Sequence, residues 1–173
     1  TVGTVVSGLG TVFKGNTDAL CTIQDIAGGQ LFNPGRGGGD WQDGGKHQIL
    51  FMHGWKDDNG YIANGWNGAW GKVSAINKAI ATIEKYKEDY LDPTDLENWI
   101  YELRGMRAIF YWYLVDMYGN VPICKSADQT VSETVPSSRQ DVYEFLRDEL
   151  TEVIPHLVEA KCQDANSDYY GRV

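Results

Sequence analysis

Aromatic side chains are concentrated in a glycine-rich part of this 173-residue chain, which contains 6 Trp, 10 Tyr and 20 Gly. Four of the Trp lie between positions 41 and 70. Indole and phenol rings combine a flat apolar face with a polar group, and this combination suits the apolar face of a pyranose ring. An ordinary place in the hydrophobic core is an equally good interpretation of any single Trp.

The sequence around each Trp separates the two interpretations. Trp41 and Trp55 lie in non-periodic, glycine-rich sequence, where a core position is less natural. Trp66 and Trp70 lie inside a helical pattern, and we interpret them as packing residues. A core position is therefore less natural for Trp41 and Trp55 than for Trp66 and Trp70.

No residue pattern of a catalytic or metal site stands out. The 24 Asp and Glu supply no distinct pair of the kind that glycoside hydrolysis needs. His47, His53 and His156 are too scattered for a zinc motif. The Gly-rich residues 35–39 lack the Lys-Ser/Thr of a phosphate loop. Residues 57–60 favour a plain turn over a calcium loop, because no Glu closes such a loop. We expect no enzyme and no cofactor, and no motif supports calcium.

The acidic composition narrows the class of ligand. The formal net charge is −9 and the sequence pI is about 4.7. Nucleic acids and anionic membrane surfaces require clustered Lys and Arg, so both are excluded, whereas a neutral sugar needs no charged site.

Cys21, Cys124 and Cys162 leave one cysteine unpaired in any disulfide scheme. No stretch approaches the roughly 18 apolar residues of a membrane span. No signal peptide is seen, and we expect a mature or trimmed chain.

Helical periodicity is weak before residue 60 and strong after it. Apolar residues within 2–13 predict a first helix, and residues 15–60 show no sustained period and predict loops. A helix is then predicted from Trp66 to Tyr90. Its apolar stripe comprises Val73, Ile76, Ile80 and Ile83.

Two further long helices follow, each with a start signal. Thr94 and Glu97 form a capping box after the break at Asp92-Pro93, and Gly119 suits the end of that helix. Its stripe comprises Leu103, Met106, Phe110, Tyr113 and Met117. After a polar linker, Ser138 and Asp141 cap the last helix. The stripe of that helix comprises Val142, Leu146, Leu150, Val153 and Leu157.

The helices on either side of Asp92-Pro93 predict an antiparallel hairpin, which is the unit of tetratricopeptide-type arrays. Such units bury their faces against neighbours, so a stable array needs about three of them. The sequence holds one hairpin and one unpartnered helix. It therefore predicts a mostly α-helical, incomplete chain of tetratricopeptide-like hairpins with long irregular loops, and we expect the native protein to continue past Val173.

Residues 102–123 resemble the signature of the SusD/RagB family. The matching residues are Glu102, Arg107-Ala108, the aromatic run 110–113, Leu114-Val115 and Tyr118-Gly119-Asn120-Val121-Pro122. Further matches are Trp66, Trp70, Ile76-Asn77 and Ile80 upstream, and Arg139, Val142-Tyr143, Asp148-Glu149-Leu150 and Gly171-Arg172 downstream. The resemblance covers about residues 61–173 in order. From the residues themselves, we expect Arg104 and Arg107 to hold buried or interhelix carboxylates and Asn77 to be a core hydrogen-bonding residue.

The resemblance implies a single SusD-like N-terminal domain over residues 1–173. Its first helix and aromatic, Gly-rich loops occupy residues 1–60, and its helical repeat region occupies residues 61–173. The resemblance also implies a surface-exposed lipoprotein of the outer membrane that is not an enzyme. Such a protein captures an oligo- or polysaccharide and delivers it to a TonB-dependent, SusC-like transporter. Its N-terminal lipid anchor is absent from this chain, and Cys21 is not assigned to it.

The resemblance places the ligand contacts in the loops before the signature hairpin. In this chain those loops supply Asp40, Trp41, His53, Trp55, Asn59 and Tyr61 as the glycan-binding candidates. Trp41 and Trp55 would stack on sugar rings, and Asp40 and Asn59 would bond hydroxyls.

Two other functions remain open at the level of sequence. A helical-repeat adaptor for protein or peptide, without a sugar site, predicts that the Trp-rich loop is packed against the helices. A helical carbohydrate-active enzyme predicts two carboxylates that face a common cleft. The sequence does not name the glycan, the oligomeric state or the native termini.

Overall fold

The computed structural model describes residues 20–35, 38, 43–89 and 93–157. Every regular element in these residues is a helix, and the mostly α-helical class is confirmed. The elements are α2 (Leu20–Ala27), η1 (Asp43–Gly45), α3 (Lys46–Phe51), α4 (Gly60–Tyr86), η2 (Lys87–Asp89), α5 (Pro93–Tyr118), α6 (Arg139–Val153) and η3 (Ile154–His156). The first helix predicted within residues 2–13 lies outside the described residues.

The chain divides into two compact units, the first ending at Lys72 and the second beginning at Val73. In the first unit, α2 and α3 contact each other. Their buried apolar side chains are Ile23, Ile26 and Leu50. These helices lie where the sequence predicted only loops, because elements of 8 and 6 residues are too short to establish a helical period.

Both short helices end in the same left-handed cap. After α2, Gly29 has a φ of 75°, and Gln30 N donates to Asp25 O at 2.8 Å. After α3, the equivalent position is His53 with a φ of 54°, and Gly54 N donates to Ile49 O at 2.9 Å. These are Schellman motifs, in which glycine is the usual left-handed residue.

Helix α4 begins at Gly60, earlier than the predicted start at Trp66. Asn59 Oδ1 accepts hydrogen bonds from Tyr61 N at 3.1 Å and from Ile62 N at 3.4 Å. This side chain satisfies amides that have no partner at a helix N-terminus. Gly60 and Gly65 lie in these first turns, and glycine is a poor helix former, which weakened the helical signal in the sequence.

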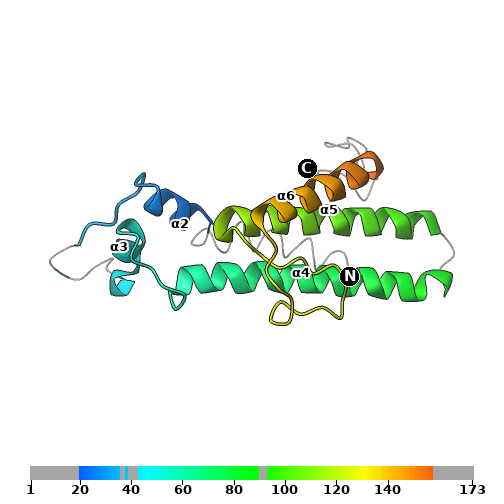
Figure 1. Cartoon of the computed structure of the whole chain (residues 1–173), viewed down its shortest axis with the longest axis horizontal. Helices are drawn as coiled ribbons and strands as arrows, with labels where there is room; N and C mark the ends of the chain where they lie inside the picture. Colours follow the sequence, from blue (N-terminus) through cyan, green and yellow to red (C-terminus); the bar gives the residue numbers. More distant parts are fainter. Residues whose placement is uncertain (1–19, 36–37, 39–42, 90–92, 158–173) are drawn as a thin grey trace. The chain divides into compact units, whose positions relative to one another are not determined.

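The second unit is built on an antiparallel pair of long helices. The later part of α4 runs beside α5 in the opposite direction, and α6 packs on α5 (Figure 1). The predicted stripe of α5 is confirmed in its central part, because Leu103, Met106, Phe110 and Tyr113 are all buried. The contact with α6 is close at Gly105. A Cβ atom built there would lie 3.4 Å from Val153 Cγ1 and 3.7 Å from Leu157 Cδ1.

The ends of α5 and α6 follow the predicted signals with two differences. Gly119 ends α5 with a φ of 75°, and Ser138 and Asp141 form the predicted capping box of α6. However, α5 begins at Pro93, since proline is well suited to the first turn of a helix. Helix α6 ends at Val153, before Pro155, and the last residue of the predicted stripe, Leu157, is 38% exposed.

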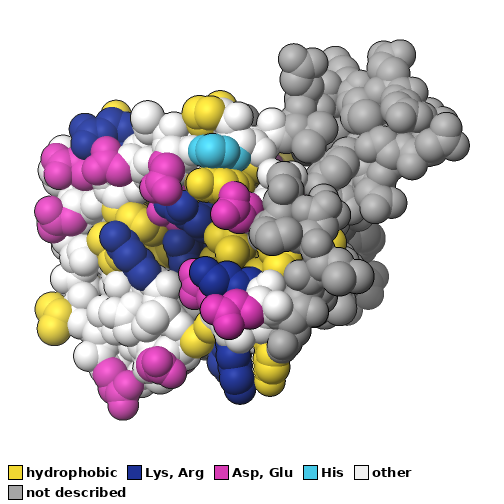
Figure 2. All heavy atoms as spheres, turned by 90° about the vertical axis from the view of Figure 1, so that its right-hand side faces the viewer, with side chains coloured by type: hydrophobic (Ala, Val, Ile, Leu, Met, Phe, Trp, Pro, Cys, Tyr) yellow, Lys and Arg dark blue, Asp and Glu magenta, His cyan; other side chains and the backbone are white. Residues whose placement is uncertain are grey.

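The surface carries charges of both signs. On the face seen in Figure 2, basic and acidic side chains are interspersed, and apolar side chains lie exposed between them. None of the described helices is both long enough and apolar enough to cross a membrane.

Candidate functional site

The first unit presents an exposed histidine–tryptophan pair at the end of α3. His53 Nε2 lies 2.7 Å from the carbonyl oxygen of Ala27. A carbonyl oxygen only accepts hydrogen bonds, so Nε2 carries the proton and donates. This bond joins the end of α3 to the end of α2. The left-handed backbone and the tether together fix the direction of the His53 ring.

The indole of Trp55 is placed against that fixed ring. The ring centroids of His53 and Trp55 are 5.3 Å apart, with an angle of 62° between the planes. This edge-on contact is a favourable geometry for aromatic rings. Trp55 is 36% exposed, so its indole is open to solvent. The pair therefore forms a positioned aromatic surface that is open to solvent.

Other large apolar side chains of the same unit are also exposed. Phe32 and Phe51 contact each other edge-on, with centroids 4.9 Å apart. Their exposed fractions are 59% and 39%, and that of Met52 is 69%. Scattered exposed apolar residues are ordinary, but several on one small unit are typical of an interaction surface.

His47 is the centre of a second polar cluster, in which it bridges Asn33 and Tyr61. Asn33 Nδ2 lies 3.0 Å from His47 Nδ1, and Tyr61 Oη lies 3.1 Å from His47 Nε2. The amide nitrogen donates, so Nδ1 accepts and Nε2 carries the proton that is donated to Tyr61. The His47 and Tyr61 rings are also stacked, with centroids 5.4 Å apart. Sequence reasoning missed this cluster, because His47 is 14 residues from each partner.

The structure thus separates the predicted glycan contacts into groups. His53 and Trp55 lie together at an exposed position. The side-chain oxygen Oδ1 of Asn59 is used as the cap of α4, and the Tyr61 hydroxyl is bonded to His47. Asp40 and Trp41 lie outside the described residues.

Trp66 and Trp70 are packing residues, as predicted. Their rings are 5.6 Å apart, and Trp70 is only 6% exposed.

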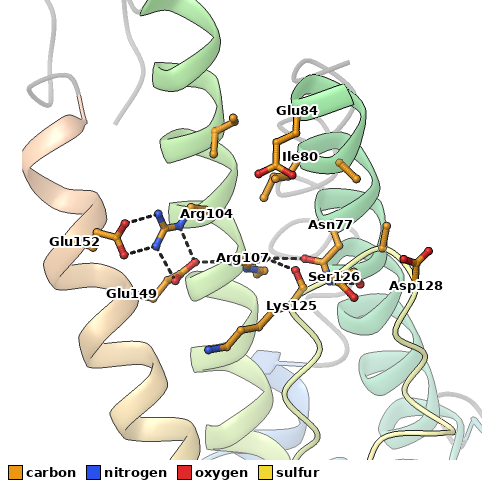
Figure 3. Close-up of a pocket in the computed structure, with 13 residues that line it drawn as sticks. Asn77, Ile80, Glu84, Arg104, Arg107, Lys125, Ser126, Asp128, Glu149 and Glu152 are labelled. Carbon is orange, nitrogen blue, oxygen red and sulfur yellow. Dashed lines mark hydrogen bonds and ion pairs between the residues drawn. The ribbon is translucent and has the colours of Figure 1, made fainter. Parts of the chain in front are cut away.

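The signature residues form a polar network in the second unit (Figure 3). Arg107 Nη2 donates to Glu149 Oε1 at 2.5 Å, and Arg107 Nη1 donates to Asn77 Oδ1 at 2.8 Å. Arg104 bridges Glu149 at 3.0 Å and Glu152 at 2.6 Å. The expectation that both arginines hold carboxylates, and that Asn77 bonds in the core, is confirmed.

The same residues fasten the loop after α5. Asn77 Nδ2 donates to Cys124 O at 3.0 Å, and Arg107 Nη1 donates to Lys125 O at 3.1 Å. Tyr111 Oη donates to Cys124 O at 3.1 Å and accepts from Cys124 N at 2.7 Å. Asn120 Oδ1 accepts from Arg139 N at 2.9 Å at the start of α6. The signature therefore specifies how this loop and α6 lie on α4 and α5.

The network alters the acidity of its carboxyl groups. Burial acts to raise the pKa of Glu149, but hydrogen bonds from Arg104 and Arg107 outweigh burial, and the pKa lies below the ordinary 4.5. The hydrogen bond from Arg104 likewise lowers the pKa of Glu152. Both groups are held as carboxylates. Across the described ranges, no group of three or more His, Cys, Asp or Glu is arranged to hold a metal ion.

Comparison with known proteins finds similarity to SusD-like proteins. No family model matches it. A SusD-like protein of Bacteroides ovatus is 27% identical over 105 residues, which cover 60% of this chain and 19% of that protein. The solved structure of surface glycan-binding protein A from Bacteroides fluxus aligns with a TM-score of 0.72 and 18% identity, covering 99% of this chain and 37% of that one. The solved structure of a SusD-like carbohydrate-binding protein from Bacteroides fragilis aligns with a TM-score of 0.57 and 19% identity. The alignment covers 90% of this chain and 34% of that one.

These similarities confirm the predicted resemblance, and the two structures show that the fold is SusD-like. The chain spans 19% of the length of the curated relative and 37% and 34% of the two solved chains.

Proposed function

We propose that this chain is part of a non-enzymatic surface protein that captures an oligo- or polysaccharide. The observation that carries this proposal is the exposed indole of Trp55, held by a His53 ring whose own position is fixed by Ala27. The names of the similar proteins, which include a glycan-binding and a carbohydrate-binding protein, support the choice of ligand.

The physical basis of capture is stacking supplemented by hydrogen bonds. The apolar face of a pyranose ring lies on the indole of Trp55, and nearby polar groups bond its hydroxyls. Loss of one stacked ring costs roughly 1–3 kcal/mol of affinity, by analogy with base–aromatic stacking. Each neutral hydrogen bond contributes about 1 kcal/mol net. One such contact binds weakly, and several contacts along a polymer raise the overall affinity.

The test is affinity electrophoresis in native gels that contain single polysaccharides. The parent chain should be retarded by at least one neutral glycan, and Trp55→Ala should lose most of that retardation. Trp112→Ala is the matched control, because Trp112 is an exposed indole on α5 of the second unit, 51% accessible. Equal retardation of the parent and Trp55→Ala in every glycan that shifts the parent would reject the site. Turnover of those glycans would reject the non-enzymatic role.

The proposal includes delivery of the glycan to a SusC-like, TonB-dependent transporter at the cell surface, through a lipid-anchored protein. The SusD-like relative and fold support this part. Co-purification of the full-length protein with a transporter encoded beside its gene is the expected result. Recovery of the protein only from the periplasm, without such a transporter, would contradict it.

An adaptor for protein or peptide is the second candidate function. The observation in its favour is the exposure of Ile109 (41%) and Trp112 (51%) on α5 and of Tyr143 (57%) on α6. If this function is the correct one, Trp112→Ala weakens capture of the protein partner, and no polysaccharide retards the parent chain.

A further inference from the structure

The ring of His53 has a second nitrogen, Nδ1, that takes no part in holding the ring in place. Nε2 donates its proton to Ala27 O at 2.7 Å, and the flipped ring would place a carbon atom against that oxygen. A neutral imidazole carries one N–H, so Nδ1 is an unprotonated acceptor. Within the described part of the chain, no group donates a hydrogen bond to it.

This acceptor lies beside the exposed indole of Trp55. The two nitrogens of an imidazole point in nearly opposite directions, so the bond from Nε2 to α2 turns Nδ1 away from α2. The His53 side chain is exposed, and the centre of its ring lies 5.3 Å from that of the Trp55 ring. Nδ1 is therefore the polar ring atom of His53 that is available to a ligand on the indole.

The backbone of His53 also indicates that its side chain is needed. Among the described residues, His53 is the one non-glycine residue with a positive φ, at 54°. The equivalent position after α2 is occupied by Gly29, the residue type that normally ends a helix in this way. A side chain in such a conformation persists when the surrounding structure or a function requires it.

An unprotonated nitrogen distinguishes between the groups that a sugar presents. A free hydroxyl donates a hydrogen bond to it, whereas ether, ester and carboxylate oxygens carry only lone pairs, which the lone pair of Nδ1 repels. A pyranose ring that lies on the indole has hydroxyls around its edge. The short distance between the His53 and Trp55 rings brings one of these hydroxyls within reach of Nδ1.

We propose that His53 determines the specificity of the Trp55 site, because its Nδ1 accepts a hydrogen bond from a free hydroxyl of the sugar unit stacked on Trp55. The site then selects a neutral unit in which this hydroxyl is unsubstituted. It disfavours a unit in which the hydroxyl is methylated or acetylated, or in which a carboxylate takes its place. This proposal rests on the proposed glycan-binding function and deepens it.

Long-range ¹H–¹⁵N NMR of the intact, ¹⁵N-labelled chain tests both the tautomer and the contact. At pH 8, above the range in which histidines usually titrate, the free chain should have the His53 proton on Nε2. The probes are cellotetraose, maltotetraose and xylotetraose, and the tetrasaccharide of any other polysaccharide that retards the parent chain. At least one probe should move the His53 Nδ1 signal to lower frequency in a saturable manner, as an accepted hydrogen bond does.

His47 is the matched control in the same spectrum. Its Nδ1 is also unprotonated, but it already accepts a hydrogen bond from Asn33 Nδ2 at 3.0 Å. The His47 Nδ1 signal should therefore stay in place while that of His53 moves. A free chain with the His53 proton on Nδ1, or equal movement of the two signals, would overturn the proposal.

Modified ligands identify the hydroxyl that donates. Each deoxyfluoro derivative of the methyl disaccharide that corresponds to the responding probe has one hydroxyl replaced by fluorine, which cannot donate. One derivative should bind the parent chain about fivefold more weakly, as expected for one lost hydrogen bond. His53→Phe keeps a ring against Trp55 but has no acceptor, so this variant should bind that derivative and the unmodified disaccharide equally. A fivefold loss that persists in His53→Phe would assign the hydroxyl to another group and reject the proposal.

The outcomes separate this proposal from the proposed function. If the probes move the Trp55 indole signal but leave His53 Nδ1 in place, the role of His53 is rejected and the glycan site stands. If no probe moves either signal and no polysaccharide retards the parent chain, the glycan-binding function itself fails, and the role of His53 fails with it.

Discussion

His53 has a backbone conformation that glycine normally supplies. A residue with a side chain in this left-handed region costs roughly 1–2 kcal/mol. The ring of His53 offsets part of that cost through its hydrogen bond to Ala27 O at 2.7 Å. Backbone strain of this kind often occurs where a side chain has a function. Here the conformation directs the His53 ring toward both α2 and Trp55.

Two substitutions at this position separate the strain from the hydrogen bond. His53→Ala keeps the left-handed strain and loses the bond, so we expect the free energy of unfolding to fall by about 1 kcal/mol. His53→Gly loses the same bond but also removes the strain, and its stability should lie about 1 kcal/mol above that of His53→Ala. Urea denaturation midpoints measure both values. A glycine variant no more stable than the alanine variant would contradict the assignment.

At the scale of elements, the ion pairs between α5 and α6 fix how these helices pack. Breaking a buried pair by removing one partner is costly, because the remaining charge is left without compensation. Glu149 and Arg107 form such a pair, and their exposed side-chain fractions are only 9% and 7%. We expect Glu149→Gln to lower the free energy of unfolding at pH 7 by about 3 kcal/mol.

The contribution of Glu149 to the free energy of unfolding should depend on pH in a defined direction. Its folded-state pKa lies below the ordinary 4.5, so its contribution is full above that pH and is lost as the pH falls through the folded pKa. The gap in urea midpoint between parent and Glu149→Gln should therefore narrow from pH 7 to pH 3. Glu144→Gln, at an exposed position of α6, is the control and should show no gap at either pH. A constant gap would argue against the ion pair.

The close contact between α5 and α6 makes Gly105 sensitive to side-chain size. An added Cβ meets Val153 at 3.4 Å, an ordinary contact, and alanine favours a helix over glycine by about 1 kcal/mol. Gly105→Ala should therefore be neutral or stabilising, whereas Gly105→Leu overfills the contact and should cost about 1–3 kcal/mol.

Gly71 provides the matched control, because nothing lies within 4 Å of a Cβ built there. Both Gly71→Ala and Gly71→Leu should raise the thermal midpoint. If Gly105→Leu is as stable as Gly71→Leu, the two helices are not packed closely at this position.

The sequence predicted the long helices of the second unit because their determinants are local. The two members of the capping box, Ser138 and Asp141, are only three positions apart, and Gly119 acts at its own position. The short helices of the first unit and the early start of α4 were missed, since they depend on Schellman caps and on Asn59 rather than on a repeating apolar stripe. The continuation past Val173 and the single-domain organisation stay predictions.

The arrangement of the residues in the candidate site could not be predicted from the sequence, for a physical reason. The resemblance to the SusD/RagB family pointed to the loops that hold Trp55 and His53, but the arrangement of the two rings depends on a hydrogen bond from His53 to a backbone oxygen 26 residues earlier. Every residue has a backbone carbonyl oxygen, so the residue type does not show which one accepts the bond from His53. The hydrogen bond between Tyr61 and His47 and the capping role of Asn59 likewise depend on the folded structure, and no local pattern in the sequence indicates them.

At the scale of the whole molecule, the chain has a net charge of −9, but a neutral glycan carries no charge for it to attract or repel. The response of binding to salt therefore tests whether the ligand is neutral. Stacking and neutral hydrogen bonds are barely affected by ions, whereas contacts between exposed charges are screened. Gel retardation by a neutral glycan should therefore be unchanged when NaCl is raised to about 0.5 M. Retardation that disappears with salt would indicate an ionic ligand in place of a neutral sugar.

The central claim is that the exposed indole of Trp55 holds the glycan, and calorimetric titration tests it most directly. The ligand is an oligosaccharide from the polysaccharide that retards the parent chain. We predict that affinity falls in the order parent, Trp55→Phe, Trp55→Ala, with a total loss of about 5- to 150-fold, which corresponds to 1–3 kcal/mol. An unchanged Kd in Trp55→Ala would contradict the account.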